Sequence, residues 1–196
     1  MDLSQNFFNK MELLYQQFQE HDATQTDRLN RYRNIETESA KLLNILLRIQ
    51  QSKRILEIGT STGYSTLWLA EAAKSLNAKI TTLEIDNDRT QQAKSYAEEF
   101  EFSHLIEFRV MDAVEYLSHS YEVFDFILLD AERDAYCEYW KYLPDLIRNN
   151  GGVLVVDNVI SHQLEVENFI KLVQEDSQFI TTTLNVGAGL FLVTKI

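Results

Sequence analysis

The stretch RILEIGTSTGYSTLWLAEAA, residues 54–73, joins a strand pattern to a helix pattern through a turn that contains two glycines. Residues 54–58 form a short, mainly apolar run, which is typical of a buried strand. Gly59 and Gly63 then enclose three hydroxyl side chains, after which apolar residues return at helical spacing. Because ligands of α/β proteins bind between the end of a strand and the start of a helix, this stretch predicts both an α/β fold and a ligand at the turn.

The same alternation of strand and helix continues along the chain. Apolar strand patterns recur at 79–85, 106–110, 124–130 and 152–158, and helical patterns follow them at 88–100, 112–117, 135–147 and 165–176. Two last strand patterns, at 179–186 and 189–196, have no helix between them and predict an antiparallel hairpin. We therefore expect a Rossmann-like α/β fold: a mostly parallel seven-stranded sheet with an antiparallel C-terminal hairpin and helices on both faces.

Composition favours a single domain over residues 1–196, with N-terminal helices in 1–50 and an α/β core in 51–196. The chain has 196 residues, 45% of them hydrophobic, and can bury one sizeable core. Its net charge of -12 argues against nucleic-acid binding, because phosphate binders cluster lysine and arginine. The basic stretch DRLNRYR, at 27–33, carries charges of both signs, as solvated helix faces do.

Nothing in the sequence indicates a membrane or secreted protein. No apolar run is long enough to cross a bilayer, and the N-terminus lacks the basic start and apolar core of a signal peptide. The single cysteine, Cys137, cannot form an intrachain disulfide. We expect a cytoplasmic protein that does not bind membranes.

The turn after the first strand differs from a dinucleotide-binding turn. Ser61 stands where the G-x-G-x-x-G fingerprint has its second glycine, and Glu57 would repel a pyrophosphate. The turn fits a ligand that carries an ammonium group and a carboxylate. Glu57 would attract the cation directly or through water, and the amides and hydroxyls from Ser61 to Ser65 would meet the carboxylate at the helix start.

The ends of the next two strands indicate an adenosine group. Glu84 ends the second strand, where an acidic side chain accepts both ribose hydroxyls of adenosine cofactors. Adenine is expected beside Asp112 and Ala113, after the third strand. An amino-acid group at the first turn and a ribose at the second describe S-adenosylmethionine. The expected cofactor-binding residues are Glu57, Gly59, Thr60, Ser61, Gly63, Tyr64, Ser65, Glu84, Ile85, Asp112, Ala113, Asp130 and Tyr136.

Four motifs together resemble a known family. LEIGTSTGYSTLWLA, ITTLEID, FDFILLDAERDAY and GGVLVVDNVISH are similar in order and spacing to motifs of the small bacterial O-methyltransferases related to catechol O-methyltransferase. The resemblance extends from about Ile35 to the end of the chain. It implies a class I methyltransferase fold, S-adenosylmethionine as donor, a divalent cation that is often magnesium, and methylation of a hydroxyl on a small aromatic acceptor.

The resemblance also implies a metal site at Asp130, Asp157 and Asn158. Three oxygen ligands leave room around Mg²⁺ for water and for an acceptor with two hydroxyls. The ion would lower the pKa of the acceptor hydroxyl and orient it toward the methyl group. The alternative is structural: Asp130 would cap the following helix, and Asp157 and Asn158 would form a turn.

One position departs from the family pattern. The family reads DADK, with a lysine that assists proton removal, whereas this chain reads DAER and places Arg133 there. Arginine is a poor general base but can bind an acidic acceptor or stabilise its oxyanion. A surface ion pair with Glu132 or Asp134 is the plainer alternative. The catalytic candidates are Asp130, Arg133 and His162, of which His162 titrates in the useful range for a base.

The aromatic side chains have two interpretations each. Tyr136 is expected to line the cofactor or acceptor pocket, and Trp140 to pack in the core. Tyr64 either covers the methionine end of the donor or is packed. In the predicted first helix, residues 3–18, the apolar side chains of Phe7, Phe8, Met11 and Leu14 favour a homodimer or pack on their own domain. A second amphipathic helix is predicted at 35–49.

The leading functional hypothesis is an O-methyltransferase that uses S-adenosylmethionine as donor and is assisted by a divalent cation such as magnesium. One alternative is a methyltransferase that needs no metal. A second hypothesis is a non-catalytic S-adenosylmethionine-binding protein, motivated by the missing lysine. A third, a nicotinamide-dependent reductase, is disfavoured by Ser61 and by the antiparallel ending. A small molecule is the expected acceptor, but no motif identifies it.

Overall fold

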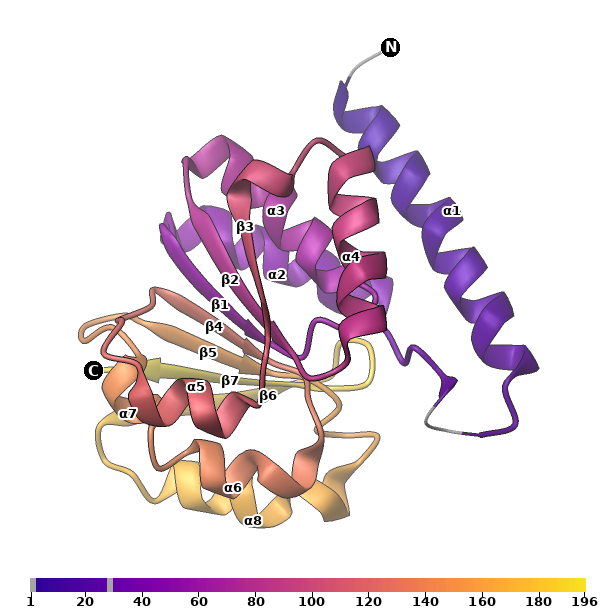
Figure 1. Cartoon of the computed structure of the whole chain (residues 1–196). Coiled ribbons are helices and arrows are strands. Elements are labelled where there is room, and N and C mark those ends of the chain that lie inside the picture. Colours follow the sequence, from indigo (N-terminus) through magenta and orange to yellow (C-terminus); the bar gives the residue numbers. More distant parts are fainter. Residues whose placement is uncertain (1–2, 28–29) are drawn as a thin grey trace.

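The computed structural model describes residues 3–27 and 30–196 (Figure 1). Two residues of the basic stretch at 27–33, Arg28 and Leu29, lie outside the described residues. The helices are α1 (Leu3–Thr24), α2 (Thr37–Gln50), α3 (Tyr64–Leu76), α4 (Asn87–Glu99), η2 (Ser103–Leu105), α5 (Ala113–His119), η3 (Arg133–Ala135), α6 (Tyr136–Tyr139), α7 (Leu143–Leu146) and α8 (Gln163–Gln174). The strands are β1 (Arg54–Ile58), β2 (Lys79–Glu84), β3 (Ile106–Val110), β4 (Phe126–Leu129), β5 (Val153–Val156), β6 (Phe179–Leu184) and β7 (Leu190–Lys195).

The strands form one seven-stranded sheet in the order β3-β2-β1-β4-β5-β7-β6. The first five strands pair in parallel, and β7 pairs antiparallel with both β5 and β6. The central strands are apolar because both of their faces are covered, and every residue of β4 is buried. The predicted fold class is confirmed, including the antiparallel hairpin at one edge.

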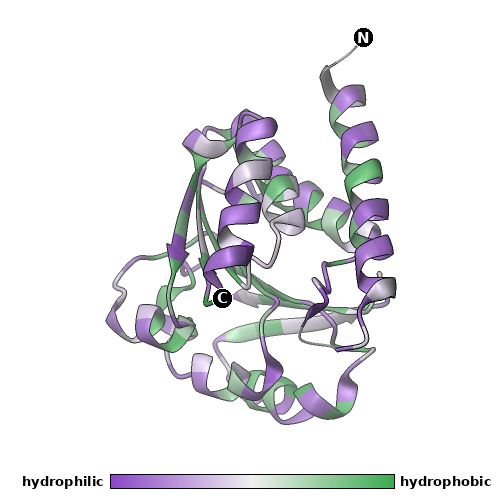
Figure 2. Cartoon of the chain, turned by 45° about the vertical axis from the view of Figure 1, so that its right-hand side comes forward, coloured by the Kyte–Doolittle hydropathy of each residue, from purple (hydrophilic) through white to green (hydrophobic). Residues whose placement is uncertain are grey.

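Helices cover both faces of the sheet (Figure 1). Successive strand residues point to opposite faces, so Ile55 belongs to the core beneath α1, α2, α3 and α4, and Leu56 belongs to the core beneath α5, α6, α7 and α8. Figure 2 shows central strands that are largely hydrophobic, between helices that carry both hydrophobic and hydrophilic residues along their length. Across the described ranges, none of the helices has the length and apolar character needed to cross a membrane.

Helix α1 packs against its own chain. Phe7, Met11 and Leu14 are buried. The ring centroid of Phe7 lies 5.2 Å from that of Trp68 of α3, in an edge-on contact. Phe8 is 44% exposed and also contacts Trp68. Packing on the same domain, the alternative to a dimer interface, therefore accounts for three of the four apolar residues singled out in this helix. A homodimer stays a prediction.

The prediction of a single helix at 135–147 is wrong. The structure has two short helices, α6 and α7, separated by a turn. Pro144 occupies the first turn of α7, where its missing N–H is tolerated, but it would break the interior of a longer helix. The residue before it, Leu143, is also restricted by the proline ring. The helical spacing of the aromatic residues concealed this break.

Candidate active site

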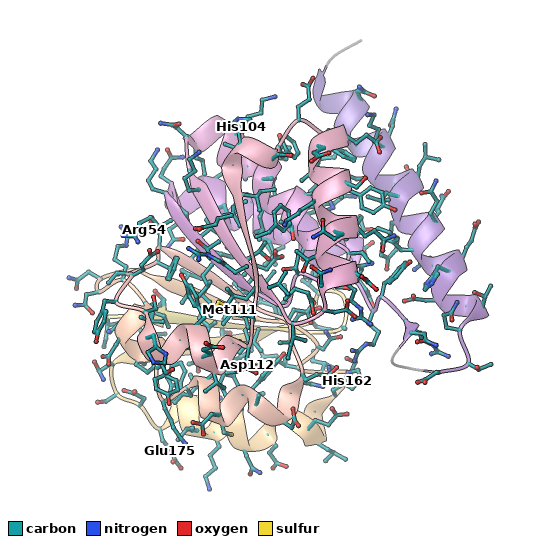
Figure 3. All side chains as sticks on the ribbon, in the orientation of Figure 1. Arg54, His104, Met111, Asp112, His162 and Glu175 are labelled. Carbon is teal, nitrogen blue, oxygen red and sulfur yellow. The ribbon has the colours of Figure 1, made fainter. Side chains whose placement is uncertain are left out.

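A cavity of about 600 Å³ lies at the carboxyl ends of the parallel strands. The segments that follow β1, β2, β3, β4 and β5 all contribute to its lining, as expected for an open α/β sheet. In Figure 3, Met111 and Asp112 lie just beyond β3, and His162 lies in the segment after β5. The cavity-lining residues that the sequence predicted are Gly59, Thr60, Ser61, Ser65, Glu84, Ile85, Asp112, Ala113, Asp130, Arg133, Asn158 and His162.

Five predicted site residues do not line this cavity: Glu57, Gly63, Tyr64, Tyr136 and Asp157. Tyr64 is fully buried, where its hydroxyl lies 2.9 Å from the hydroxyl of Thr37, so the packed alternative describes it. The Tyr136 hydroxyl donates to the carbonyl of Ala131, at 3.2 Å, and supports the loop after β4 from behind. Trp140 is buried, as expected.

Glycine is required at Gly59 by both conformation and space. Its φ is +102°, and a Cβ there would lie 2.0 Å from the carbonyl oxygen of Asp130. The β1 loop therefore passes directly against the start of the loop after β4. Gly63 has φ +88° and approaches Ala93 of α4, where an added Cβ would lie 2.9 Å from the Cβ of Ala93. Between these two glycines, Ser61 has φ 46° and lines the cavity.

Glu84 connects the first two loops. One carboxylate oxygen accepts the backbone N–H of Ser61, at 2.8 Å, and the other accepts those of Ile85 and Asp86, each at 3.0 Å. Each oxygen of a carboxylate has two acceptor positions, so the bonds to the loops leave capacity for a ligand hydroxyl. Glu84 thus holds the β1 loop in place in addition to lining the cavity.

Glu57 is buried behind the loop. Its carboxylate accepts three hydroxyls, from Ser65 at 2.6 Å, Thr66 at 2.5 Å and Thr82 at 2.6 Å. Burial raises the pKa of Glu57 to about 7, opposed by these three hydrogen bonds and reinforced by the charge of Asp130. Ser65 lines the cavity and Glu57 does not, so the hydroxyl of Ser65 lies between the Glu57 carboxylate and a ligand in the cavity.

The three candidate metal ligands are in mutual contact. The amide nitrogen of Asn158 donates to Asp130, at 3.1 Å, and to Asp157, at 3.0 Å. Asp130 thus accepts a hydrogen bond from Asn158. It does not occupy the Ncap position of the next short helix, η3, so the alternative in which Asp130 caps that helix is wrong. The second carboxylate oxygen of Asp157 is buried and has no hydrogen-bond partner in the described part of the chain.

The electrostatics of this pair favour a cation. Burial raises the pKa of Asp130 to about 6, and burial together with the charge of Asp130 raises the pKa of Asp157 to about 8. Two close carboxylates in a buried place repel each other when both are ionised. Within residues 3–27 and 30–196, no group of three or more histidine, cysteine or acidic side chains could hold a metal, so the candidate set consists of two carboxylates and one amide.

Arg133 does not form the surface ion pair considered from the sequence. Its side chain is 7% exposed, and its Nε donates to Glu165 at the start of α8, at 2.7 Å. Glu132 instead pairs with Arg33, at 2.6 Å. His162 lines the cavity with its Nδ1 2.8 Å from the Ser161 hydroxyl. The charge of Arg133 lowers the pKa of Asp130, against the larger effect of burial.

One wall of the cavity was missed by the sequence interpretation. We call residues 31–36 the strap, of which 32–35 line the cavity. Asp22 of α1 accepts the backbone N–H groups of Tyr32, at 2.7 Å, and Arg33, at 2.9 Å. The strap also contacts the β1 loop, because the Ser61 hydroxyl donates to the carbonyl of Tyr32, at 2.8 Å. Other missed lining residues are Arg89, Met111 and Tyr139.

Comparison with known proteins places the chain in a family. The model of the O-methyltransferase family matches residues 9–196. The chain belongs to this O-methyltransferase family. The resemblance seen in the motifs from about Ile35 to the end of the chain is thereby confirmed, and the family match begins earlier, within the first helix.

Individual O-methyltransferases are similar over much of the chain. A catechol O-methyltransferase of Niastella koreensis is 33% identical over 131 residues, which cover 65% of this chain and 58% of that protein. The chain thus spans less than two thirds of this curated relative. The structure of an O-methyltransferase from Bacillus cereus in complex with SAH has a TM-score of 0.78 at 26% identity, covering 96% of this chain and 91% of that one. That of TomG from Streptomyces achromogenes, in complex with SAM, has a TM-score of 0.73 at 30% identity, covering 83% and 81%.

Proposed function

We propose that this protein transfers the methyl group of S-adenosylmethionine to a hydroxyl of a small aromatic acceptor, assisted by a divalent cation. The observation that carries the proposal is one continuous cavity that contains both Glu84 and Asp130 with Asn158. A ribose acceptor and a candidate cation site thus face the same space. Two structural relatives above 25% identity are described as complexes with SAH or SAM, and one curated relative is named a catechol O-methyltransferase.

The donor would lie along the loops that follow β1, β2 and β3. Its amino-acid end would face Ser61 and Ser65, and a ribose hydroxyl would donate to the remaining acceptor position of Glu84. Adenine would lie between Ile85 and Ala113, which line the cavity after β2 and β3. The start of α3 follows directly, so backbone N–H groups and the helix dipole would favour a carboxylate there.

The residues at the β4 and β5 ends fit a divalent cation. Asp130, Asp157 and Asn158 supply oxygen atoms of the kind that Mg²⁺ prefers. The unpartnered oxygen of Asp157 and the raised pKa values of both carboxyls are the features that a cation would satisfy. A bound cation would supply Lewis-acid stabilisation of the acceptor oxyanion.

The remaining requirements fall on the chain's own residues. Displacement at the methyl carbon needs the acceptor oxygen in line with the breaking carbon–sulfur bond, so the cavity walls contribute by orientation. The acceptor loses its hydroxyl proton, and His162 is the proposed recipient because it lines the cavity and imidazole is the side chain most often used as a general base. Arg133 also lines the cavity and is proposed to stabilise negative charge on the acceptor.

Calorimetric titration with S-adenosylmethionine, with and without Mg²⁺, followed by mass spectrometry of a panel of phenols and catechols, tests the proposal. We expect donor binding in both conditions and a mass gain of one methyl group on a catechol only with Mg²⁺. Equal turnover in EDTA would support the metal-independent alternative. Donor binding with no methylated product would favour a non-catalytic binding protein, and absence of donor binding would refute the proposal.

A further inference from the structure

Arg33 occupies an unusual position in the strap. It lines the main cavity and also a second cavity of about 370 Å³, between the strap and α1. Its φ is +52°, which is uncommon for a residue other than glycine and is energetically unfavourable unless the surroundings hold it. Asp22 imposes it here by accepting the backbone N–H of Arg33. The chain therefore holds this arginine at the junction of the two cavities in spite of local strain.

The guanidinium of Arg33 is only partly satisfied. Its Nη2 donates to Glu132, at 2.6 Å, across the cavity from the loop after β4. Its Nε is buried and has no hydrogen-bond partner among the described residues. Nε and Nη2 form the edge of an arginine that binds a carboxylate through two parallel hydrogen bonds. Glu132 uses one half of that edge and leaves the other unused.

Glu132 is a partner that a ligand can displace. Its side chain is 60% exposed, whereas that of Arg33 is 31% exposed. An ion pair with one largely exposed member contributes little to stability. A carboxylate fixed by other contacts in the cavity and aligned with both nitrogens would bind the guanidinium more strongly than Glu132 does, because charge-assisted bidentate contacts are the stronger kind.

We propose that Arg33 binds a carboxylate of the ligand in the main cavity, in place of Glu132. The inference rests on the proposed function, which supplies two sources of that carboxylate. One is the amino-acid end of the donor, since Asn34, next to Arg33, donates to Thr62 of the β1 loop at 3.0 Å. The other is an acidic substituent of the acceptor, since Arg33 is close enough to Asp130 for its charge to act on that carboxyl.

Binding of truncated ligands distinguishes the two sources without requiring turnover. S-adenosylhomocysteine carries the amino-acid end, and 5′-methylthioadenosine lacks it. If the donor supplies the carboxylate, Arg33→Gln weakens S-adenosylhomocysteine about tenfold, the low end for a hydrogen bond to a charged group, and leaves methylthioadenosine unchanged. If the acceptor supplies it, the same variant weakens 3,4-dihydroxybenzoate but not catechol, in protein saturated with S-adenosylhomocysteine and Mg²⁺.

Two matched variants make the test specific. Arg31→Gln removes the same charge two residues away, where the guanidinium donates to the carbonyl of Gln25, and should change no affinity. Glu132→Gln should tighten the carboxylate ligand by about two- to fivefold, because it removes the competing anion. Arg33→Gln and Glu132→Gln thus act in opposite directions.

Several results would overturn the proposal. If the Arg33–Glu132 pair only holds the strap to the loop after β4, Arg33→Gln and Glu132→Gln should lower the affinity for every ligand alike, whether or not the ligand carries a carboxylate. Unchanged affinities in both variants would also reject it, and Glu132 is exposed enough for its variant to fold. Failure of the proposed function is a different result: the wild type would then bind neither S-adenosylhomocysteine nor methylthioadenosine.

Discussion

Replacing Gly59 with alanine tests whether the β1 loop has any room beside Asp130. At φ +102° an alanine pays a backbone cost of about 1–2 kcal/mol. The new Cβ would also lie 2.0 Å from a backbone carbonyl, which cannot rotate away as a side chain would. Overpacking of this kind adds about 1–3 kcal/mol. We expect a total loss of about 2–5 kcal/mol in the free energy of unfolding.

Gly151 provides the matched control, because its φ is +105° and nothing lies within 4 Å of an added Cβ. Gly151→Ala should cost only the backbone contribution, about 1–2 kcal/mol, or roughly 2–8 °C in Tm at this chain length. Gly59→Ala should lower Tm further and weaken S-adenosylhomocysteine binding, since Asp130 must shift. Thermal melts and calorimetry of both variants measure this. Equal Tm losses with unchanged binding would refute the reasoning.

Three further predictions concern charged groups. Asp157→Asn should raise Tm in EDTA, by relieving repulsion with Asp130, and should abolish any Mg²⁺-induced rise in Tm; a retained rise would count against the cation site. Burial raises the pKa of Glu57 above its unfolded value, so unfolding releases a proton and stability falls as pH rises from about 4.5 to about 7. Urea melts across this range should show a decline of roughly 3 kcal/mol that Glu57→Gln removes; parallel pH curves would contradict the assignment. Arg133→Gln should raise Mg²⁺ affinity at pH 7, because it removes a positive charge that acts on Asp130 and repels the ion, whereas Arg133→Lys keeps that charge and should leave the affinity unchanged; calorimetry showing an equal loss of affinity in both variants would assign Arg133 a packing role.

Local patterns predicted the sheet well, for a physical reason. Strands buried on both faces must be apolar, so β1, with four of its five residues buried, begins and ends where the apolar run does. β3 lies at the edge of the sheet and is mostly exposed, yet it also spans the predicted residues. The break between α6 and α7 was missed because aromatic spacing continued across Pro144. The sequence could not show that α1 packs against α3. The apolar face of a helix indicates that another surface covers it, but it does not identify that surface.

The site was predictable only where it follows strands. Glu84, Asp130 and Asn158 stand at strand ends, so the topology brings them to one edge. The strap has no periodicity, and its place depends on the carboxylate of Asp22, ten residues away. The pair between Arg33 and Glu132 joins residues 99 positions apart, a separation that no local pattern reports.

The position of β7 inside the sheet affects how the chain folds during synthesis. β7 leaves the ribosome after β5 and β6, yet it lies between them in the sheet. Until residues 190–195 emerge, β5 has an open edge and β6 has no neighbour to pair with. An open, apolar strand edge is a template for pairing with other chains. Nascent chains stalled before residue 190 are therefore the form of this protein most in need of a chaperone.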